Sequence, residues 1–241
     1  MKKIAIIIAG GSGKRMGQDI PKQFLNVGEK PIIMYTLEKF QNHPSIDGII
    51  VVCIEGWKMI LESYTNQFNI SKLVSIVSGG SCGQESIRNG LNEAKRLYND
   101  DDIVLIHDAI RPMISNEIIS DNITQCIKYG NATAVVPCTT VVLEKTNLEY
   151  SNKVVDRDKL FLTQTPQAFV LKDILQAHEE AEKKGIKDSV ASCSLYTELD
   201  RKVYYSIGSE TNIKLTRPAD IEIFKALLNV QKSDWMKKTS F

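Results

Sequence analysis

The sequence lacks the residue patterns that hold disulfide-rich or metal-binding proteins together. Its five cysteines are odd in number and far apart, and no two form a Cys-x-x-Cys pair. This spacing argues against a disulfide framework and against a zinc knuckle. The three histidines are scattered as well and share no metal-ligand spacing with the cysteines. Cys53 and Cys126 lie among apolar residues and are predicted to be small core residues.

An excess of charge of either sign is also missing. The 30 Lys and Arg residues almost balance the 29 Asp and Glu residues, which gives a formal net charge of +1. A chain so nearly neutral has no electrostatic footprint for nucleic acid or for an anionic membrane, so neither is expected as a partner. Cations that bind an anionic ligand must therefore be clustered locally.

Long hydrophobic runs are absent too, since no apolar run approaches the ~20 residues of a membrane span. The apolar segment after Lys2 and Lys3 is short and runs into glycines, with no small-residue cleavage site of the kind that ends a signal peptide. We therefore expect a cytoplasmic protein. A chain of 241 residues can bury a full core as one domain, residues 1–241.

What the sequence does contain is an alternation of short apolar runs and helical stretches. Strands are predicted at Ile4–Ile8, Ile49–Cys53, Leu73–Val77, Ile103–Ile106 and around Val135–Val136, with a late edge strand at Val203–Ile207. Helices are predicted to begin at Pro31, Trp57, Ser86 and Pro218 and to cover Glu117–Tyr129 and Lys172–Lys184. This alternation predicts an α/β fold with a doubly wound, mostly parallel sheet.

The pattern changes between about residues 138 and 160. This segment is polar, is rich in Thr, Val, Asn and Lys, and has no apolar helical stripe. Val141–Leu143 and Lys153–Val155 are predicted to form the two sides of a β-hairpin. Taken alone, such a hairpin is a surface excursion of a single monomer.

Three polar motifs each follow the end of a predicted strand: Gly10–Lys22, Gly79–Ser86 and His107–Arg111. In a doubly wound sheet, ligands bind beyond the carboxyl ends of the strands. We therefore expect the three motifs to meet at one rim of the sheet and to form a single site.

The first motif has the composition of a loop that binds a polyphosphate. Its glycines between residues 10 and 13 let the backbone approach a ligand closely, and the N–H groups of such a loop can converge on anionic oxygens. Lys14, Arg15 and Lys22 add three cations within the same short stretch.

Two better-known glycine loops do not match. A P-loop has Ser or Thr after its Gly-Lys pair, whereas Gly13-Lys14 is followed by Arg15. The dinucleotide fingerprint Gly-x-Gly-x-x-Gly would need a glycine where Met16 stands. The spacing therefore argues against an NAD-dependent dehydrogenase.

The sugar-alcohol-phosphate cytidylyltransferase family has motifs that residues 10–16 (Gly-Gly-Ser-Gly-Lys-Arg-Met) and 21–24 (Pro-Lys-Gln-Phe) resemble. The resemblance covers nearly the whole chain, because four motifs occur in family order. It implies a Rossmann-like sheet of the nucleotidyltransferase type, with an inserted β-arm at about 138–160 that grips a second subunit in a homodimer. It also implies transfer of CMP from CTP to a polyol phosphate, which gives a CDP-alcohol and pyrophosphate, with Mg²⁺ as cofactor.

Two branches of this family stand closest, and they differ in the acceptor. Residues 24–33, 49–57 and 208–218 look more like the branch that uses ribitol 5-phosphate. Ribitol 5-phosphate is therefore the expected acceptor. The alternative is 2-C-methyl-D-erythritol 4-phosphate, a substrate of isoprenoid precursor synthesis.

The resemblance implies catalytic roles for four cations. Arg15 and Lys22 would hold the triphosphate and stabilise the five-coordinate phosphorus, and Lys214 would join them from the far end of the chain. Arg157 would reach the acceptor phosphate in the site of the partner subunit. Each of these cations taken alone would more often be a solvated surface charge.

The resemblance also implies which residues bind the two substrates. The residues expected at the nucleotide are Ala9, Gly10, Gly11, Gly13, Gly80, Ser81, Ser86, Asp108 and Ala109. The residues expected at the acceptor are Arg111, Thr140, Arg157 and Thr216. Asp108 would also be the metal ligand, since Mg²⁺ is often bound by one carboxylate together with substrate phosphates. The alternative for Asp108 is a turn cap or an ion pair with Arg111.

The sequence departs from the family at several positions. Gly83 replaces an arginine that is usual in the family, Ser81 replaces a common acidic residue, and an Asp-Thr pair reads Thr140-Val141. An acidic signature is blurred within residues 188–194. These departures leave open a non-catalytic nucleotide-binding protein of the same fold, although the cations expected at the phosphates favour an enzyme.

Overall fold

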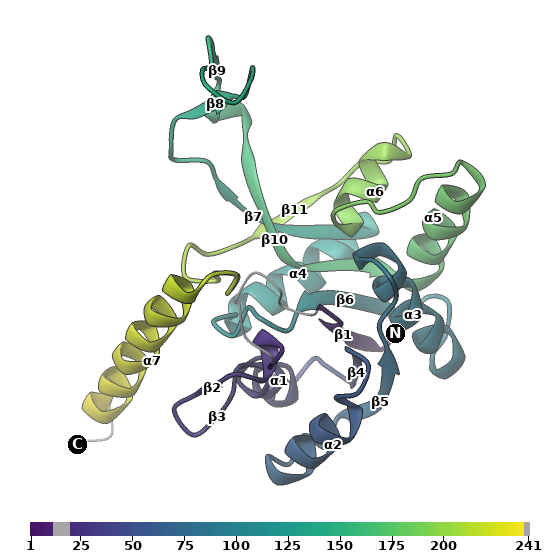
Figure 1. The fold of residues 1–241 in the computed structure, drawn as a ribbon. Coiled ribbons are helices and arrows are strands. Elements are labelled where there is room, and N and C mark those ends of the chain that lie inside the picture. Colours follow the sequence, from purple (N-terminus) through teal and green to yellow (C-terminus); the bar gives the residue numbers. More distant parts are fainter. Residues whose placement is uncertain (12–19, 239–241) are drawn as a thin grey trace.

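The computed structural model describes residues 1–11 and 20–238, with residues 231–238 described by their backbone alone. A seven-stranded sheet has the order β11-β7-β10-β6-β1-β4-β5 (Figure 1). Its strands are β1 (Lys3–Ala9), β4 (Gly48–Cys53), β5 (Leu73–Ser78), β6 (Ile103–Asp108), β7 (Asn131–Pro137), β10 (Phe161–Val170) and β11 (Tyr205–Ile207). Only β10 is antiparallel to its neighbours. The prediction of an α/β fold with a mostly parallel sheet is therefore confirmed.

Helices cover both faces of this sheet. They are α1 (Ile32–Asn42), α2 (Lys58–Gln67), α3 (Gly83–Leu97), α4 (Asn116–Tyr129), α5 (Leu171–Lys183), α6 (Ser192–Glu198) and α7 (Pro218–Lys238). One apolar cluster joins the sheet to α1, α2 and α4, and a second joins it to α3, α5 and α6. Ala5 and Ile7 belong to the first cluster and Ile4 and Ile6 to the second, because successive strand side chains point to opposite faces. Burial on both faces explains the continuous apolar run of β1.

The helix and strand boundaries agree closely with the sequence pattern, with one informative exception. Gly130 ends α4 in the left-handed conformation, with φ 87°, as expected of a C-cap glycine. Helix α3, however, begins at Gly83 rather than at Ser86. The reason is that Cys82 is the N-cap, and its sulfur accepts the backbone N–H of Glu85 at 3.5 Å.

The strand β10 and the helix α6 were not predicted from the sequence, and neither was the short antiparallel pair β2 (Asn26–Val27) and β3 (Lys30–Pro31). Strand β10 has a polar middle with Pro166, and its register with β7 shifts between Thr163 and Gln167. A proline normally argues against a central strand, and here it lies inside the irregular stretch. Helix α6 has only seven residues, which is too short for a clear apolar period.

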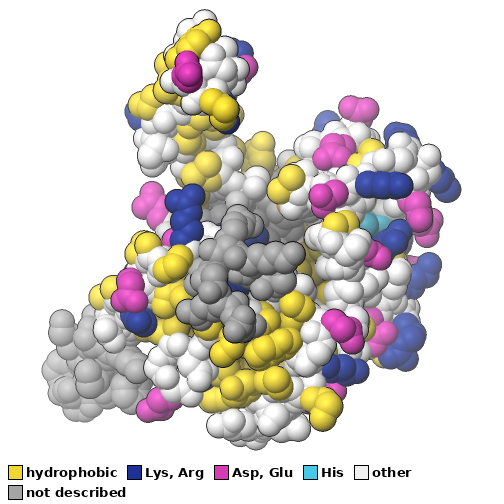
Figure 2. All heavy atoms as spheres, viewed as in Figure 1, with side chains coloured by type: hydrophobic (Ala, Val, Ile, Leu, Met, Phe, Trp, Pro, Cys, Tyr) yellow, Lys and Arg dark blue, Asp and Glu magenta, His cyan; other side chains and the backbone are white. Residues whose placement is uncertain are grey.

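Residues 138–160 leave the sheet between β7 and β10 and form a projecting segment, which we call the arm (Figure 1). Its strands β8 (Val142–Glu144) and β9 (Lys153–Val155) pair antiparallel, so the predicted hairpin is confirmed. The arm carries exposed apolar side chains, visible in yellow in Figure 2; Val141 is 71% exposed and Leu148 is 89% exposed.

The segment that follows β11 leads into α7, and both pack against the start of α1. Leu215 and Phe224 are buried in a third apolar cluster, together with Ile32 at the start of α1. Phe224 meets the ring of Tyr35 edge-on, with 5.2 Å between the ring centroids. Although α7 is long, neither it nor any other helix in the described part of the chain is apolar enough over a sufficient length to cross a membrane.

Helix α3 approaches the sheet closely at Gly90. A Cβ atom at this position would lie 2.6 Å from Ile6 Cγ2 and 2.8 Å from Val52 Cγ2. These methyl groups belong to the buried core, so the helix backbone itself packs on the strands. Gly90 therefore sets the distance between α3 and the sheet, and with it the position of the loop that precedes α3.

We predict that Gly90→Ala destabilises the protein by about 1–3 kcal/mol, because the added methyl overpacks the core. The matched control is Gly83→Ala in the same helix, where a Cβ would have nothing within 4 Å. Urea unfolding of both variants measures the difference. Alanine at both positions gains helix propensity, so equal stability of the two variants would contradict the close packing at Gly90.

Candidate active site

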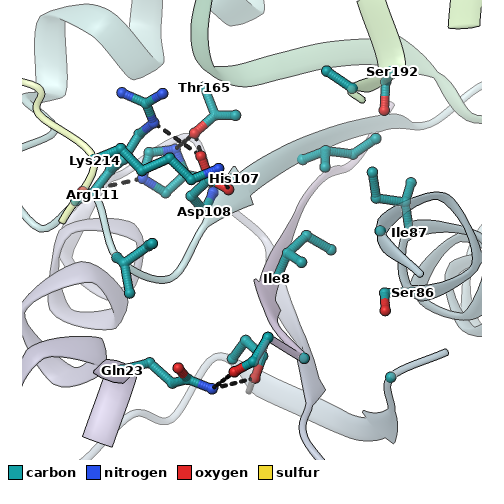
Figure 3. Close-up of a pocket in the computed structure, with 18 of the residues that line it drawn as sticks. Ile8, Gln23, Ser86, Ile87, His107, Asp108, Arg111, Thr165, Ser192 and Lys214 are labelled. Atoms are coloured by element: carbon teal, nitrogen blue, oxygen red, sulfur yellow. Dashed lines mark hydrogen bonds and ion pairs between the residues drawn. The ribbon is translucent and has the colours of Figure 1, made fainter. Parts of the chain in front are cut away.

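A cavity of about 840 Å³ opens at the carboxyl ends of the parallel strands (Figure 3). The residues that line it come from all three polar motifs and from the segment before α7. Those among them that were predicted as site residues are Ala9, Gly10, Gly11, Lys22, Gly80, Ser81, Ser86, Asp108, Arg111 and Lys214. The described parts of the three motifs therefore meet at one rim, as expected, whereas residues 12–19 of the first motif lie outside the described residues.

Some predicted site residues do not line this cavity. Ala109 is buried, and its carbonyl accepts the Thr36 hydroxyl at 2.8 Å. The hydroxyl and the backbone N–H of Thr216 both donate to Asp220, at 3.0 and 2.7 Å, so Thr216 supports the start of α7. Arg15 and Gly13 lie outside the described residues.

Thr140 and Arg157 are on the arm rather than at the cavity. Thr140 is exposed at the start of the arm. Arg157 begins the 3-10 turn η3 (Arg157–Lys159), and its Nη1 donates to the carbonyl of Thr139 at 2.8 Å. The side chain of Arg157 is half exposed. Within one chain, the structure thus divides the predicted residues between the cavity and the arm.

One wall of the cavity is built from glycine backbone. The chain after β1 and the chain after β5 are so close that a Cβ at Gly10 would lie 3.5 Å from Gly79 Cα and 3.2 Å from Ser86 Oγ. The Ser86 hydroxyl accepts the N–H of Gly80 at 2.9 Å and donates to the carbonyl of Cys82 at 2.9 Å. Ser86 therefore fixes the loop that ends in α3, which is a role that the sequence alone did not indicate.

The same loop is closed a second time by Glu85. Its carboxylate accepts the backbone N–H of Ser81 at 2.7 Å and the Ser81 hydroxyl at 2.5 Å. The hydrogen bond from this hydroxyl lowers the pKa of the Glu85 carboxyl. Gly83, which lies between Ser81 and Glu85 in this loop, lines the cavity, and a Cβ at this position would have nothing within 4 Å. This is the position at which the resemblance to the family leads us to expect an arginine.

The opposite wall is built around Asp108, at the end of β6. Its Oδ1 lies 3.0 Å from Lys214 Nζ and its Oδ2 lies 3.0 Å from Arg111 Nε (Figure 3). Burial by itself raises the pKa of the Asp108 carboxyl, but the two cations outweigh this and lower it to about 2. The alternative that Asp108 pairs with Arg111 is thus observed, and Lys214 shares the same carboxylate.

Lys214 reaches this position because its segment is anchored on both sides. The backbone N–H of Leu215 donates to the carbonyl of Ile110 at 2.9 Å. Arg111 Nη1 donates to the carbonyl of Asn212 at 2.8 Å, across 101 positions of sequence. Lys214 lies in irregular chain, and its apolar neighbour Leu215 is buried while the lysine faces the cavity.

Gln23 is a functional residue that sequence reasoning missed. Its side chain is buried, and Nε2 donates to the carbonyls of Ala9 at 2.7 Å and Gly11 at 3.0 Å (Figure 3). Gln23 therefore ties the start of the glycine loop to η2 (Lys22–Phe24), which carries Lys22. The available signal was its position directly after the expected catalytic lysine.

Three further polar residues behind Asp108 were also missed: His107, Thr165 and Asn212. The ring of His107 is fully buried, and burial lowers its pKa to about 4. Asn212 Nδ2 donates to the carbonyl of Thr165 at 2.9 Å. Their partners are distant in sequence, so only the position of His107 beside Asp108 offered a signal.

A glycine-walled cavity at the carboxyl ends of parallel strands, with lysine, arginine and aspartate in its lining, is suited to bind the phosphates of a nucleotide. The comparisons with known proteins agree. The model of the 2-C-methyl-D-erythritol 4-phosphate cytidylyltransferase (IspD) family matches residues 3–230. The chain belongs to this family of cytidylyltransferases and is therefore a nucleotidyltransferase.

Individual relatives have two different names. The chain is 42% identical over 226 residues to a ribitol-5-phosphate cytidylyltransferase of Lacticaseibacillus paracasei, which covers 93% of this chain and 97% of that protein. It is 40% identical over 225 residues to a 2-C-methyl-D-erythritol 4-phosphate cytidylyltransferase of Clostridium acetobutylicum, covering 93% and 96% of the two chains. The crystal structure of 4-diphosphocytidyl-2C-methyl-D-erythritol synthase from Anaerococcus prevotii superposes with a TM-score of 0.81 at 27% identity, covering 95% and 96%.

We predict that Gln23→Met lowers kcat/KM for CTP by roughly tenfold to a hundredfold, because methionine has a similar size but cannot hold the glycine loop in place. The variant also loses the two hydrogen bonds to the carbonyls of Ala9 and Gly11, at a cost of about 1–3 kcal/mol of stability, although Ala9 keeps the backbone N–H of Ile54. Steady-state kinetics and urea unfolding measure the two effects.

The matched control for Gln23→Met is Gln41→Met. Gln41 also bridges two groups, since it donates to the Ser71 hydroxyl at 2.9 Å and accepts the Lys72 N–H at 2.8 Å. These partners precede β5, at the rim opposite the cavity. A kcat/KM that falls equally in both variants would show that Gln23 has no specific role in the site.

Proposed function

We propose that this protein transfers CMP from CTP to ribitol 5-phosphate, which gives CDP-ribitol and pyrophosphate. The observation that carries the proposal is the gathering of Lys22, Lys214 and Arg111 with the glycine loop around one cavity. The 42% identity to a protein named ribitol-5-phosphate cytidylyltransferase supports the choice of acceptor.

In this reaction a phosphate oxygen of the acceptor attacks the α-phosphorus of CTP, and pyrophosphate leaves. A phosphate is already a competent nucleophile, so the protein needs no activated serine or cysteine. Its task is to hold two anions in line and to neutralise the charge that develops on the phosphorus oxygens. Lys22 and Lys214 line the cavity and would do this, and the resemblance to the family adds Arg15.

Arg111 is proposed to bind the phosphate of the acceptor. Its side chain lines the cavity and is held by Asp108 and by the carbonyl of Asn212, so its guanidinium is oriented before substrate arrives. The glycine wall on the other side lets the flat base and the ribose approach the backbone. The two substrates would therefore enter from opposite walls, with the reacting phosphates between them.

Mg²⁺ is the cofactor that we propose, and Asp108 is the residue that would hold it. Among residues 1–11 and 20–238, no group of three His, Cys, Asp or Glu side chains could enclose a metal ion. One carboxylate together with substrate phosphates is, however, a common way to bind Mg²⁺, and the carboxylate of Asp108 is charged in the cavity. The ion would supply additional positive charge for the triphosphate.

We further propose that the active protein is a homodimer formed through the arm. The exposed apolar side chains of the arm are the kind of surface that subunit interfaces cover. Arg157 lies on the arm and not at the cavity of its own chain. If the arm crosses to a partner, Arg157 can contribute to the cavity of that partner, as the resemblance to the family implies.

A second candidate acceptor is 2-C-methyl-D-erythritol 4-phosphate. The match to the family model and the 40% identity to the clostridial enzyme of that name favour it. The third possibility, a non-catalytic nucleotide-binding protein, is favoured by the departures at Gly83 and Thr140-Val141. It would bind CTP and turn over no acceptor.

An acceptor panel distinguishes the three functions. Pyrophosphate release should be measured with CTP, ATP, GTP and UTP against ribitol 5-phosphate, 2-C-methyl-D-erythritol 4-phosphate and related polyol phosphates. We expect the largest kcat/KM for CTP with ribitol 5-phosphate. Turnover of 2-C-methyl-D-erythritol 4-phosphate alone would reverse the order of the two acceptors, and CTP binding without any turnover would support the non-catalytic protein.

Mixing two inactive variants tests whether subunits share the site. Arg157→Ala and Lys214→Ala should each be strongly impaired. When equal amounts of the two variants are refolded together, about half of all dimers contain one chain of each variant. If the dimer exchanges arms, each of these dimers has one intact site, so about a quarter of the wild-type activity should return. No recovery, with both variants dimeric by ultracentrifugation, would show that each chain completes its own site.

A further inference from the structure

Behind Asp108 and Arg111 lies a polar contact that the proposed chemistry does not use. The imidazole of His107 is fully buried beneath the turn that carries these two residues, and it packs against the ring of Phe40 with 5.1 Å between centroids. Although the residue is among those that line the cavity, its side chain has no exposed surface. Its two nitrogens nevertheless both have polar partners (Figure 3).

The first of these contacts determines where the ring carries its proton. Nε2 of His107 lies 3.2 Å from the carbonyl oxygen of Arg111. A carbonyl oxygen only accepts hydrogen bonds, so Nε2 must donate. A neutral imidazole has a single N–H, and with this hydrogen on Nε2 the other nitrogen, Nδ1, is an acceptor.

The second contact fits that assignment. Nδ1 lies 3.0 Å from the hydroxyl oxygen of Thr165, and the same hydroxyl oxygen accepts the backbone N–H of Asp108 at 3.1 Å. The hydroxyl therefore has its own hydrogen to donate, and Nδ1 takes it. All hydrogen bonds then run in one direction, from the Asp108 N–H through Thr165 to the ring.

The third contact extends this arrangement to Lys214. The carbonyl of Thr165 accepts Nδ2 of Asn212 at 2.9 Å, and Asn212 lies two positions before Lys214. Thr165 thus touches the turn after β6 through its hydroxyl and the segment of Lys214 through its carbonyl. The turn that carries Asp108 and Arg111 and the segment that carries Lys214 therefore meet at this one threonine.

We propose that His107 is a positioning residue, which as the neutral Nε2–H tautomer fixes the turn that carries Asp108 and Arg111. Thr165 is its partner and aligns β10 with that turn. The inference rests on the proposed function, in which Arg111 binds the acceptor. A phosphate-binding guanidinium that is displaced by about 1 Å loses much of its effect on the rate. The hydrogen bonds of His107 and Thr165 would therefore affect catalysis without contact to the reacting atoms.

A histidine that only fills space would behave differently, and the chain contains a matched example. His178 in α5 is also buried, with 4% of its surface exposed, and its Nε2 has no hydrogen-bond partner. It lies outside the cavity lining. His178→Phe is therefore the control for loss of a buried imidazole.

The tautomer can be measured directly, without activity. In the ¹⁵N-labelled full chain, long-range ¹H–¹⁵N correlation at neutral pH should show His107 with a bare Nδ1 and a protonated Nε2. The His107 signals are assigned by their absence in His107→Gln. His43 is an internal reference, because its Nδ1 accepts the backbone N–H of Ser45 at 3.2 Å. An Nδ1–H tautomer or a charged ring at His107 would overturn the proposal.

Kinetics then test the positioning role. For His107→Phe we expect kcat to fall by roughly tenfold to a hundredfold and the KM of the acceptor to rise, while the Kd of CTP from calorimetry stays within about twofold. His107→Gln keeps a donor near the Arg111 carbonyl and should recover part of kcat. Thr165→Ser should retain far more activity than Thr165→Val, because it keeps the hydroxyl.

The outcomes separate the alternatives. Kinetics of His107→Phe that match those of His178→Phe, or a parallel loss of kcat, CTP affinity and Tm, would show that His107 is only a core residue. If His107→Phe does not fold, the comparison of Thr165→Ser with Thr165→Val and the measurement of the tautomer still test the positioning role of His107. If the wild-type protein turns over no acceptor, the proposed function fails, whereas the tautomer measurement still tests the hydrogen bonds of His107 to Arg111 and Thr165.

Discussion

The carboxylate of Asp108 between Lys214 and Arg111 is the interaction on which the rest of the site depends. Two cations directed at one cavity repel each other unless an anion lies between them, and the electrostatic cost grows as water is excluded. Because the cations hold the pKa of Asp108 at about 2, the carboxylate stays charged in any physiological buffer. The carboxylate thus holds together, in the absence of substrate, the two cations that we propose bind phosphates.

The sheet topology makes this arrangement possible. β1, β4, β5 and β6 are parallel neighbours, so the chain leaves each of them at the same rim. The antiparallel strand β10 adds a residue from its irregular middle, and Thr165 there accepts the Asp108 N–H. The segment before α7 is then held against the turn after β6 by backbone hydrogen bonds. Parts of the chain that are distant in sequence therefore share one cavity because of the order and direction of the strands.

The arm is a second surface with a different character. The cavity gathers charged side chains at the ends of the strands, whereas the arm presents exposed apolar side chains and Arg157. Apolar surface of this kind gains free energy only when another surface covers it. A subunit that covers the arm would bring Arg157 near a cavity, and this links assembly to the chemistry in the function that we propose.

The sequence by itself determined the alternation of strands and helices, the three polar motifs and the hairpin, because these depend on local periodicity and on residue chemistry within a few positions. It did not determine β10 or α6, the roles of Gln23, His107 and Thr165, or the pairing of Lys214 with Asp108. The role of Thr165 and the pairing of Lys214 with Asp108 depend on partners far away in the chain; Thr165 and His107, for instance, are 58 positions apart. Only the tertiary structure brings such partners within hydrogen-bond distance, because the register of the sheet, and not the local sequence, decides which residues face one another.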